Sequence, residues 1–236
     1  MRIFNLLALA VLALSGCATT GDDPTVPVGK VFEGSVKYGV FDVPLPEGQW
    51  TVVSEHAFRT GLSARVGELW LAHFTATDAF DRAVSIRTIL EYGDKPGGGW
   101  APARDCGRTD MLYVKPVSNT PTERECYYVN HMTTAAADEK SANGEFLAEL
   151  ADRGIAVPSN AVVSVFNQAN ATNLLTVTVL FNPEADGLPP SPVPDWSASE
   201  WNARYIGRFP ERKAYVDRVI AWNAQWEDRY RAAFGR

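Results

Sequence analysis

Residues 162–181 read VVSVFNQANATNLLTVTVLF and carry the clearest structural signal in the chain. Two apolar runs, 162–167 and 174–181, flank a short link rich in Asn, Ala and Thr. In the second run apolar residues alternate with Thr176 and Thr178, and this period of two is typical of a half-buried strand. The stretch therefore predicts two strands joined as a β-hairpin.

The chain before residue 134 mostly repeats this strand-like pattern. Pro46, Glu47 and Gly48 form a turn signal between two of its apolar runs. Together with the hairpin, these runs predict a mostly antiparallel sheet of about six to eight strands. The further strands are expected at 31–36, 41–46, 50–53, 69–77, 83–92, 111–115 and 125–132.

Three segments carry helix signals. Residues 141–153 have an apolar face and are followed by Gly154, a common helix stop. Ser197 and Glu200 have the spacing of a capping box, which predicts a short helix over 197–208. A longer helix is expected over 210–234 because Pro210 suits a first turn. Apolar residues recur along it at intervals of three and four, namely Tyr215, Val219, Trp222, Trp226, Tyr230 and Ala233.

The order of these elements predicts the α+β class, with helices gathered on one face of the sheet. Residues 31–236 are expected to form a single globular domain. Five prolines between 182 and 195 predict an extended connector before the last helices.

The first residues of the chain predict export. Arg2 precedes an apolar stretch, 3–14, that is too short to cross a bilayer core of roughly 30 Å. The following Leu14-Ser15-Gly16-Cys17 resembles the lipobox of bacterial lipoproteins. This resemblance implies a signal peptide at 1–16 and lipidation of Cys17. Residues 17–30 then form a lipidated flexible tether, and Ala18 after the cysteine favours the outer membrane.

The charge balance argues against nucleic acid as a partner. The chain has 28 acidic against 22 basic residues, a net charge of −6, whereas nucleic-acid binding depends on basic side chains. Basic residues predominate only from Arg204 onward. That tail either contacts anionic envelope polymers or is a solvated helix face, and we favour the second interpretation.

Two cysteines remain after Cys17, and an exported protein permits a disulfide between Cys106 and Cys126. Two other interpretations use His131. It could join Cys126 in a zinc site with His56 or His73, or it could activate a cysteine nucleophile. Neither has the usual motif spacing, so the disulfide is the preferred prediction and no metal or cofactor is expected.

The densest polar constellation lies around the first of these cysteines. Charged residues there adjoin a constrained loop, and nearby aromatic residues could stack on a sugar or a peptide. We therefore predict that any ligand patch would consist of Trp100, Arg104, Asp105, Arg108, Asp110, Tyr127 and His131, with Tyr128 as a further aromatic candidate.

No catalytic residue is assigned, because the chain lacks the common hydrolase and nucleotide-binding motifs. The segments FNPEADG and DWSASEW are similar to sequences of proteobacterial envelope proteins to which no activity is attached. We expect a non-enzymatic binding or assembly accessory, membrane-anchored and facing the periplasm, with envelope proteins or cell-wall polymers as partners. The alternatives are a periplasmic hydrolase using carboxylates or a Cys/His group, and a carrier of a metal or small molecule.

Overall fold

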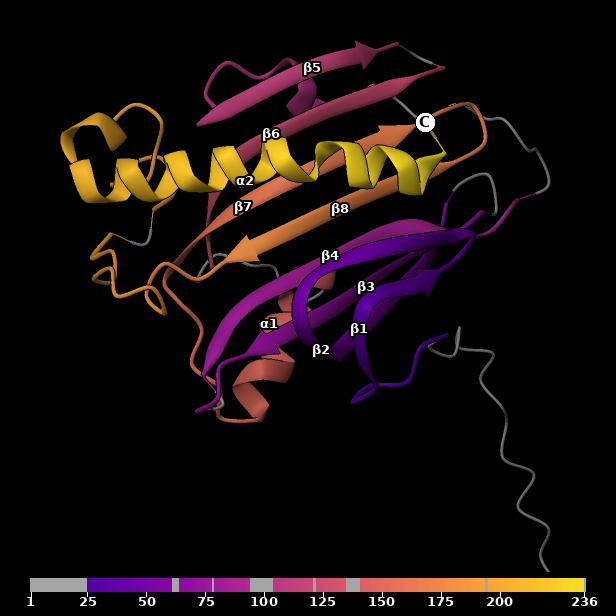
Figure 1. Ribbon diagram of the computed structural model, residues 1–236, viewed down its shortest axis with the longest axis horizontal. Helices are drawn as coiled ribbons and strands as arrows, with labels where there is room; N and C mark the ends of the chain where they lie inside the picture. Colours follow the sequence, from indigo (N-terminus) through magenta and orange to yellow (C-terminus); the bar gives the residue numbers. More distant parts are fainter. Residues whose placement is uncertain are drawn as a thin grey trace, which may run out of the picture.

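The computed structural model describes residues 25–60, 64–77, 79–93, 104–120, 122–134, 141–193 and 195–235. They form one eight-stranded sheet with the order β1-β2-β3-β4-β8-β7-β6-β5, in which each neighbouring pair is antiparallel (Figure 1). The predicted α+β class and antiparallel sheet are confirmed. The strands are β1 Val31–Tyr38, β2 Phe41–Arg59, β3 Arg65–Phe74, β4 Phe80–Glu91, β5 Tyr113–Asn119, β6 Arg124–Thr133, β7 Asn160–Ala169 and β8 Leu174–Phe181.

Two four-stranded halves make up this sheet. Strands β1 to β4 follow one another in sequence and in space, and so do β5 to β8, while β4 pairs with β8 to join the halves. The predicted hairpin 162–181 supplies β7 and β8. Its turn closes through a bond from Asn170 N to the carbonyl of Asn173, with a distance of 3.0 Å. The Asn170 side chain also accepts from the backbone of Thr172 and Asn173, which explains the polar link.

The two helices of the described chain cover opposite faces of the sheet (Figure 1). Helix α2, Pro210–Phe234, packs against the face of the sheet that carries Val162. Helix α1, Ala142–Asp152, packs against the opposite face, which carries Val163. The expectation that the helices gather on one face is therefore wrong. Every residue of β7 is buried, as both faces of a central strand must be when each is covered.

The predicted start of the long helix at Pro210 is confirmed. Pro210 stands in the first turn, and Gly235 ends the helix in the left-handed conformation with φ of 87°. The regularly spaced apolar residues of this helix pack against the sheet, where Tyr215, Val219 and Tyr230 are buried. Helix α1 begins after Ser141, whose side chain accepts from Gly144 N at 3.0 Å.

The predicted helix over 197–208 is wrong. This segment forms turns and a short 3-10 helix, η2, Ile206–Arg208. The side chain of Asp195 accepts hydrogen bonds from the backbone N–H groups of Ser197 and Ala198, at 2.7 and 3.1 Å. Glu200, the other half of the expected capping box, instead pairs with Arg212 of α2 at 2.6 Å. Local side-chain bonds thus replace the first turn of a helix.

Two features near the start of the domain also differ from expectation. The turn signal at 46–48 lies inside β2, at a point where the residue pairing between β1 and β2 shifts register. Gly48 there has φ of 119°. It is a bulge in a continuous strand rather than a turn between two strands. The described part of the predicted flexible tether, 25–30, is docked rather than flexible, because Gly29 and Lys30 both exchange backbone bonds with Val52 at 2.8 Å.

Candidate functional site

A groove of about 430 Å³ lies on the α1 face of the sheet. One cross-strand row forms much of its floor, because Trp70, Thr178, Val165 and Tyr128 come from four different strands and share an alternation. Asn143 borders it from the first turn of α1. The loop that contains Asp105, Arg108 and Met111 borders it as well, together with Trp196.

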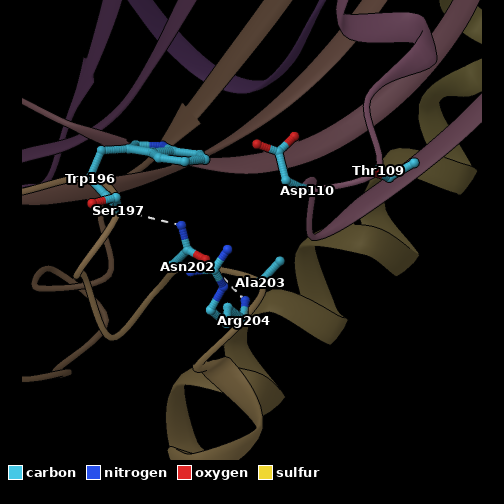
Figure 2. Close-up of a pocket in the computed structure, with 7 residues that line it drawn as sticks. All are labelled: Thr109, Asp110, Trp196, Ser197, Asn202, Ala203 and Arg204. Atoms are coloured by element: carbon cyan, nitrogen blue, oxygen red, sulfur yellow. Dashed lines mark hydrogen bonds between the residues drawn. The ribbon is translucent and has the colours of Figure 1, made fainter.

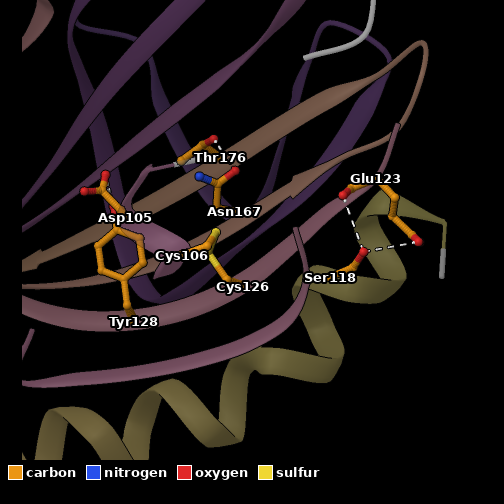
Figure 3. The surroundings of a disulfide bond; sticks show 8 residues. All are labelled: Asp105, Cys106, Ser118, Glu123, Cys126, Tyr128, Asn167 and Thr176. Carbon is orange, nitrogen blue, oxygen red and sulfur yellow. Dashed lines mark hydrogen bonds between the residues drawn. A yellow bond between two sulfur atoms is a disulfide. The ribbon is translucent and has the colours of Figure 1, made fainter. Parts of the chain in front are cut away.

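The loop at the rim is fastened to the sheet by a disulfide between Cys106 and Cys126, which confirms the prediction (Figure 3). Cys106 lies in a short 3-10 helix, η1, Arg104–Gly107, and Cys126 is fully buried on β6. A loop of this length is expected to contribute roughly 3 kcal/mol. The bridge also removes both sulfurs as thiolates, which argues against the cysteine nucleophile and the cysteine-ligated zinc site.

The charged side chains at this rim pair with one another, one guanidinium with two carboxylates. The guanidinium of Arg108 donates to both carboxylate oxygens of Asp110, at 2.7 and 2.9 Å, and to Asp105 at 3.4 Å. These bonds raise the pKa of Arg108 and lower that of Asp110. Tyr128 donates to Asp105 at 3.5 Å, and burial followed by the Asp105 charge raises the pKa of its hydroxyl. The rim therefore offers no free positive charge to a ligand and carries one carboxylate in excess.

Trp196 is held against His131 by two hydrogen bonds and a stacked ring pair. The ring centroids are 4.8 Å apart, and Trp196 Nε1 donates to the carbonyl of His131 at 3.1 Å. His131 Nε2 donates back to the carbonyl of Trp196 at 3.1 Å. Burial is the main cause that lowers the pKa of His131 to about 4, while the hydrogen bond to the Trp196 carbonyl raises it and the charge of Arg108 lowers it by smaller amounts. His131 is therefore neutral near pH 7.

Several polar atoms around the groove are buried without a hydrogen-bond partner in the structure. They are Trp70 Nε1, Asn130 Oδ1, His131 Nδ1 and Asn143 Oδ1, and all four residues line the groove. Trp70, Asn130 and His131 are only 4%, 6% and 3% exposed. A buried polar group without a partner costs roughly 1–3 kcal/mol. This concentration distinguishes the groove from an ordinary surface depression.

A second hollow, of about 410 Å³, adjoins the groove at Trp196 (Figure 2). Asp110 and Asn202 line it, and Asn202 Nδ2 donates to the carbonyl of Trp196 at 3.3 Å. Arg204 also lines this hollow, and its backbone N–H donates to Asn202 Oδ1 at 3.0 Å. Trp196 thus stands at the boundary between the two depressions.

The structure brings together part of the predicted ligand patch. Asp105, Arg108 and His131 line the groove, and Asp110 lines the adjoining hollow. Tyr127 is a correction, because it is buried on the α2 face against Phe166. Side chains alternate along a strand, so its neighbour Tyr128 reaches the groove instead. Trp100 and the side chain of Arg104 lie outside the described residues.

Sequence reasoning missed Trp70, Asn130, Asn143 and Trp196. The first lies in a recognised strand, but no local pattern marked it as part of a site. Trp196 belongs to the DWSASEW segment, which was interpreted as a helix start. For Asn130, the available signal was that a polar amide occurs inside the predicted strand 125–132.

The three histidines have separate partners. His56 Nδ1 lies 2.9 Å from Glu145 and His73 Nδ1 lies 2.8 Å from Asp81, whereas His131 bonds to Trp196. Among the described residues, no group of three or more His, Cys, Asp or Glu is placed to hold a metal ion. The described helices include none long and apolar enough to span a membrane.

Comparison of the chain with protein-family models, with curated proteins and with solved structures finds no match.

Proposed function

We propose that this protein is a membrane-anchored envelope lipoprotein, lipidated at Cys17, that acts as a non-enzymatic binding or assembly accessory facing the periplasm. The groove on the α1 face is its binding surface, and envelope proteins or cell-wall polymers are its partners. The observation that carries the proposal is the set of buried, unpartnered polar atoms at Trp70, Asn130, His131 and Asn143. A bound molecule would supply the missing hydrogen bonds.

Two further features support this proposal. The Cys106–Cys126 bridge suits an oxidising compartment outside the cytoplasm. The bridge also holds the rim residues Asp105 and Arg108 against the sheet, and a preorganised site loses less entropy when it binds. The Cys/His form of the hydrolase alternative requires a free thiol and is not compatible with bridged cysteines.

The anchor is tested by metabolic labelling with an alkyne analogue of palmitate. We expect the full-length chain to take the label and to sediment with outer membranes, and Cys17→Ser to lose the label. Thr20→Ser, three residues away, is the matched control and should behave as the parent chain. Equal labelling of Cys17→Ser and the parent would refute the lipoprotein assignment.

The binding surface is tested by photo-cross-linking in cells. A photoreactive phenylalanine at Thr178, on the floor of the groove, should form a discrete adduct with an envelope component. The same residue at Ala214, which is exposed on α2, is the control and should not form it. Identical adduct patterns from the two positions would show that the groove is not the binding surface.

A further inference from the structure

Four residues that line the groove carry unpartnered polar atoms with almost no accessible surface, so a ligand would reach these atoms as the overlying side chains shift. Trp70 Nε1 can only donate, whereas Asn130 Oδ1 and Asn143 Oδ1 accept. One donor beside two acceptors complements an amide group, whose carbonyl accepts and whose N–H donates.

The charges at the rim and the apolar side chains that line the groove restrict the class of ligand further. Arg108 is paired with Asp105 and Asp110, so an anionic ligand would lose its hydration without gaining a free counter-charge. The one carboxylate in excess is largely exposed, so it would return little of the hydration energy that a cationic ligand loses. Apolar contact comes from two valines of β7 and from Met111 and Met132. Methionine side chains adapt to apolar groups of varied shape, as peptide-binding surfaces require.

A sugar ring fits this lining less well. Sugars characteristically pack on the free face of an aromatic side chain, but Trp70 is only 4% exposed and the Trp196 ring has the Arg108 guanidinium over it, 5.4 Å from its centroid. Trp70 stacks on Phe146 with centroids 4.5 Å apart, and Trp196 stacks on His131. The Tyr128 hydroxyl is engaged by Asp105.

We propose that the groove binds a short, uncharged segment of polypeptide, with separate backbone amides bonded to Trp70 and to Asn130 and apolar side chains on Met111, Met132 and β7. This inference deepens the proposed function and rests on it. It makes an envelope protein, rather than a cell-wall polysaccharide, the partner.

The test uses the bridged domain with a pooled library of N-acetylated, C-amidated tetrapeptides built from Ala, Val, Leu, Phe and Ser. Binding is followed by ¹H–¹⁵N NMR of the tryptophan indoles, with chitotriose as the comparison ligand. We expect a peptide to shift the Trp70 indole resonance and chitotriose to leave it unchanged. The best peptide is then remade with an ester in place of one amide at a time, and one such ester should bind about tenfold more weakly.

Two variants locate the contact. Trp70→Phe removes the indole donor and should weaken peptide binding about tenfold, whereas Trp222→Phe on the α2 face should leave the affinity within about twofold. Asn130→Leu should also weaken binding, and it serves if Trp70→Phe does not fold. Peptide affinity unaffected by Asn130→Leu, or by every ester, would overturn the proposal.

The outcomes of these experiments distinguish the peptide class from the proposed function. Chitotriose binding without peptide binding would refute the peptide class and keep the groove as a binding surface. Cross-linking from Thr178 in the absence of peptide binding would likewise refute the peptide class and keep the groove as a binding surface. Failure of both ligands together with a negative cross-linking result would refute the proposed function itself.

Discussion

The contact between His131 and Trp196 shows how one residue can couple the sheet to the connector that follows it. His131 lies near the end of β6, and Trp196 lies in a turn 65 residues later in the sequence. Their stacked rings and two reciprocal hydrogen bonds fix the boundary between groove and hollow. Because the ring of His131 is buried and neutral, this contact should be sensitive to acid.

Folding lowers the pKa of His131 from 6.5 to about 4, so the unfolded chain binds more protons between these pH values. The stabilising contribution is therefore complete above about pH 6.5 and is lost as pH falls toward 4, by at most about 3 kcal/mol. Urea unfolding at a series of pH values should show this slope, and His131→Phe should reduce it. His56→Gln is the control, and equal slopes for the parent and His131→Phe would contradict the prediction.

Asn130 and Asn223 form a matched pair of buried amides. Asn130 Oδ1 has no partner in the structure, whereas Asn223 Nδ2 donates to Ser164 Oγ at 2.7 Å. Asn130→Leu should therefore leave the free energy of unfolding unchanged or raise it by about 1 kcal/mol, while Asn223→Leu should lower it by roughly 1–3 kcal/mol. Chemical denaturation measures both. A large loss with Asn130→Leu would show that this amide has a structural partner, such as a buried water.

At the scale of elements, the rim of the groove depends on a loop with little regular structure. The disulfide is the covalent tie between the segment from Arg104 to Leu112 and β6, and a hydrogen bond of 3.5 Å from Tyr128 to Asp105 adds to it. The paired charges of Asp105, Arg108 and Asp110 add surface contacts of small individual value. The bridge is therefore the main restraint on this side of the site.

Replacing both Cys106 and Cys126 by Ser should lower the free energy of unfolding by about 3 kcal/mol. It should also raise hydrogen exchange in the segment 104–112, since the loop loses its covalent tie. The backbone of α2, on the other face, is the internal control and should keep its protection relative to global unfolding. Unchanged exchange in 104–112 would show that the loop is held by its polar contacts alone.

A second element-scale prediction concerns the bulge of β2. Gly48 has φ of 119°, and a Cβ placed on it would lie 2.6 Å from His73 Nε2. Gly187 has a similarly positive φ of 85° but open space around it. Gly48→Ala should thus lower the melting temperature more than Gly187→Ala does, because strain and a clash act together. Equal shifts would show that the His73 ring moves aside at little cost.

Considered as a whole, the molecule is a sheet sandwiched between two helices that bury very different areas. Helix α2 has 25 residues and buries six large apolar or aromatic side chains, whereas α1 has 11 residues. The short helix leaves part of its face open, and the groove occupies that part. Uneven cover is therefore what creates the candidate site.

Removal of α2 should abolish folding. Its six buried apolar side chains contribute roughly 10 kcal/mol at about 1.5–3 kcal/mol each, which is comparable with the entire stability of a typical domain. A chain ending at Phe209 should show no cooperative thermal transition by circular dichroism. A synthetic peptide of residues 210–236 added in trans is the control and should restore one. A cooperative transition for the truncated chain alone would contradict the prediction.

Local sequence determined the strands, the hairpin 162–181, helix α2 and the cysteine pairing. Periods of two and of three to four, a proline at a helix start and an even cysteine count are short-range signals that need no knowledge of distant partners. Asp105, Arg108 and His131 could be nominated because they adjoin one of those cysteines. The capping box at Ser197 failed because Asp195 and Arg212 compete for the same groups.

Only the tertiary structure decided which face each helix covers and which side chains share the groove. The pairing of β4 with β8 joins residues about 90 positions apart, and a shift of one residue in that register would turn Thr178 away from Trp70. The choice of Tyr128 over Tyr127 follows from the same alternation. The alternation of apolar and polar residues within each strand could be recognised in the sequence. The register between distant strands depends on the packing of the whole sheet, and that register decides which side chains meet in the groove.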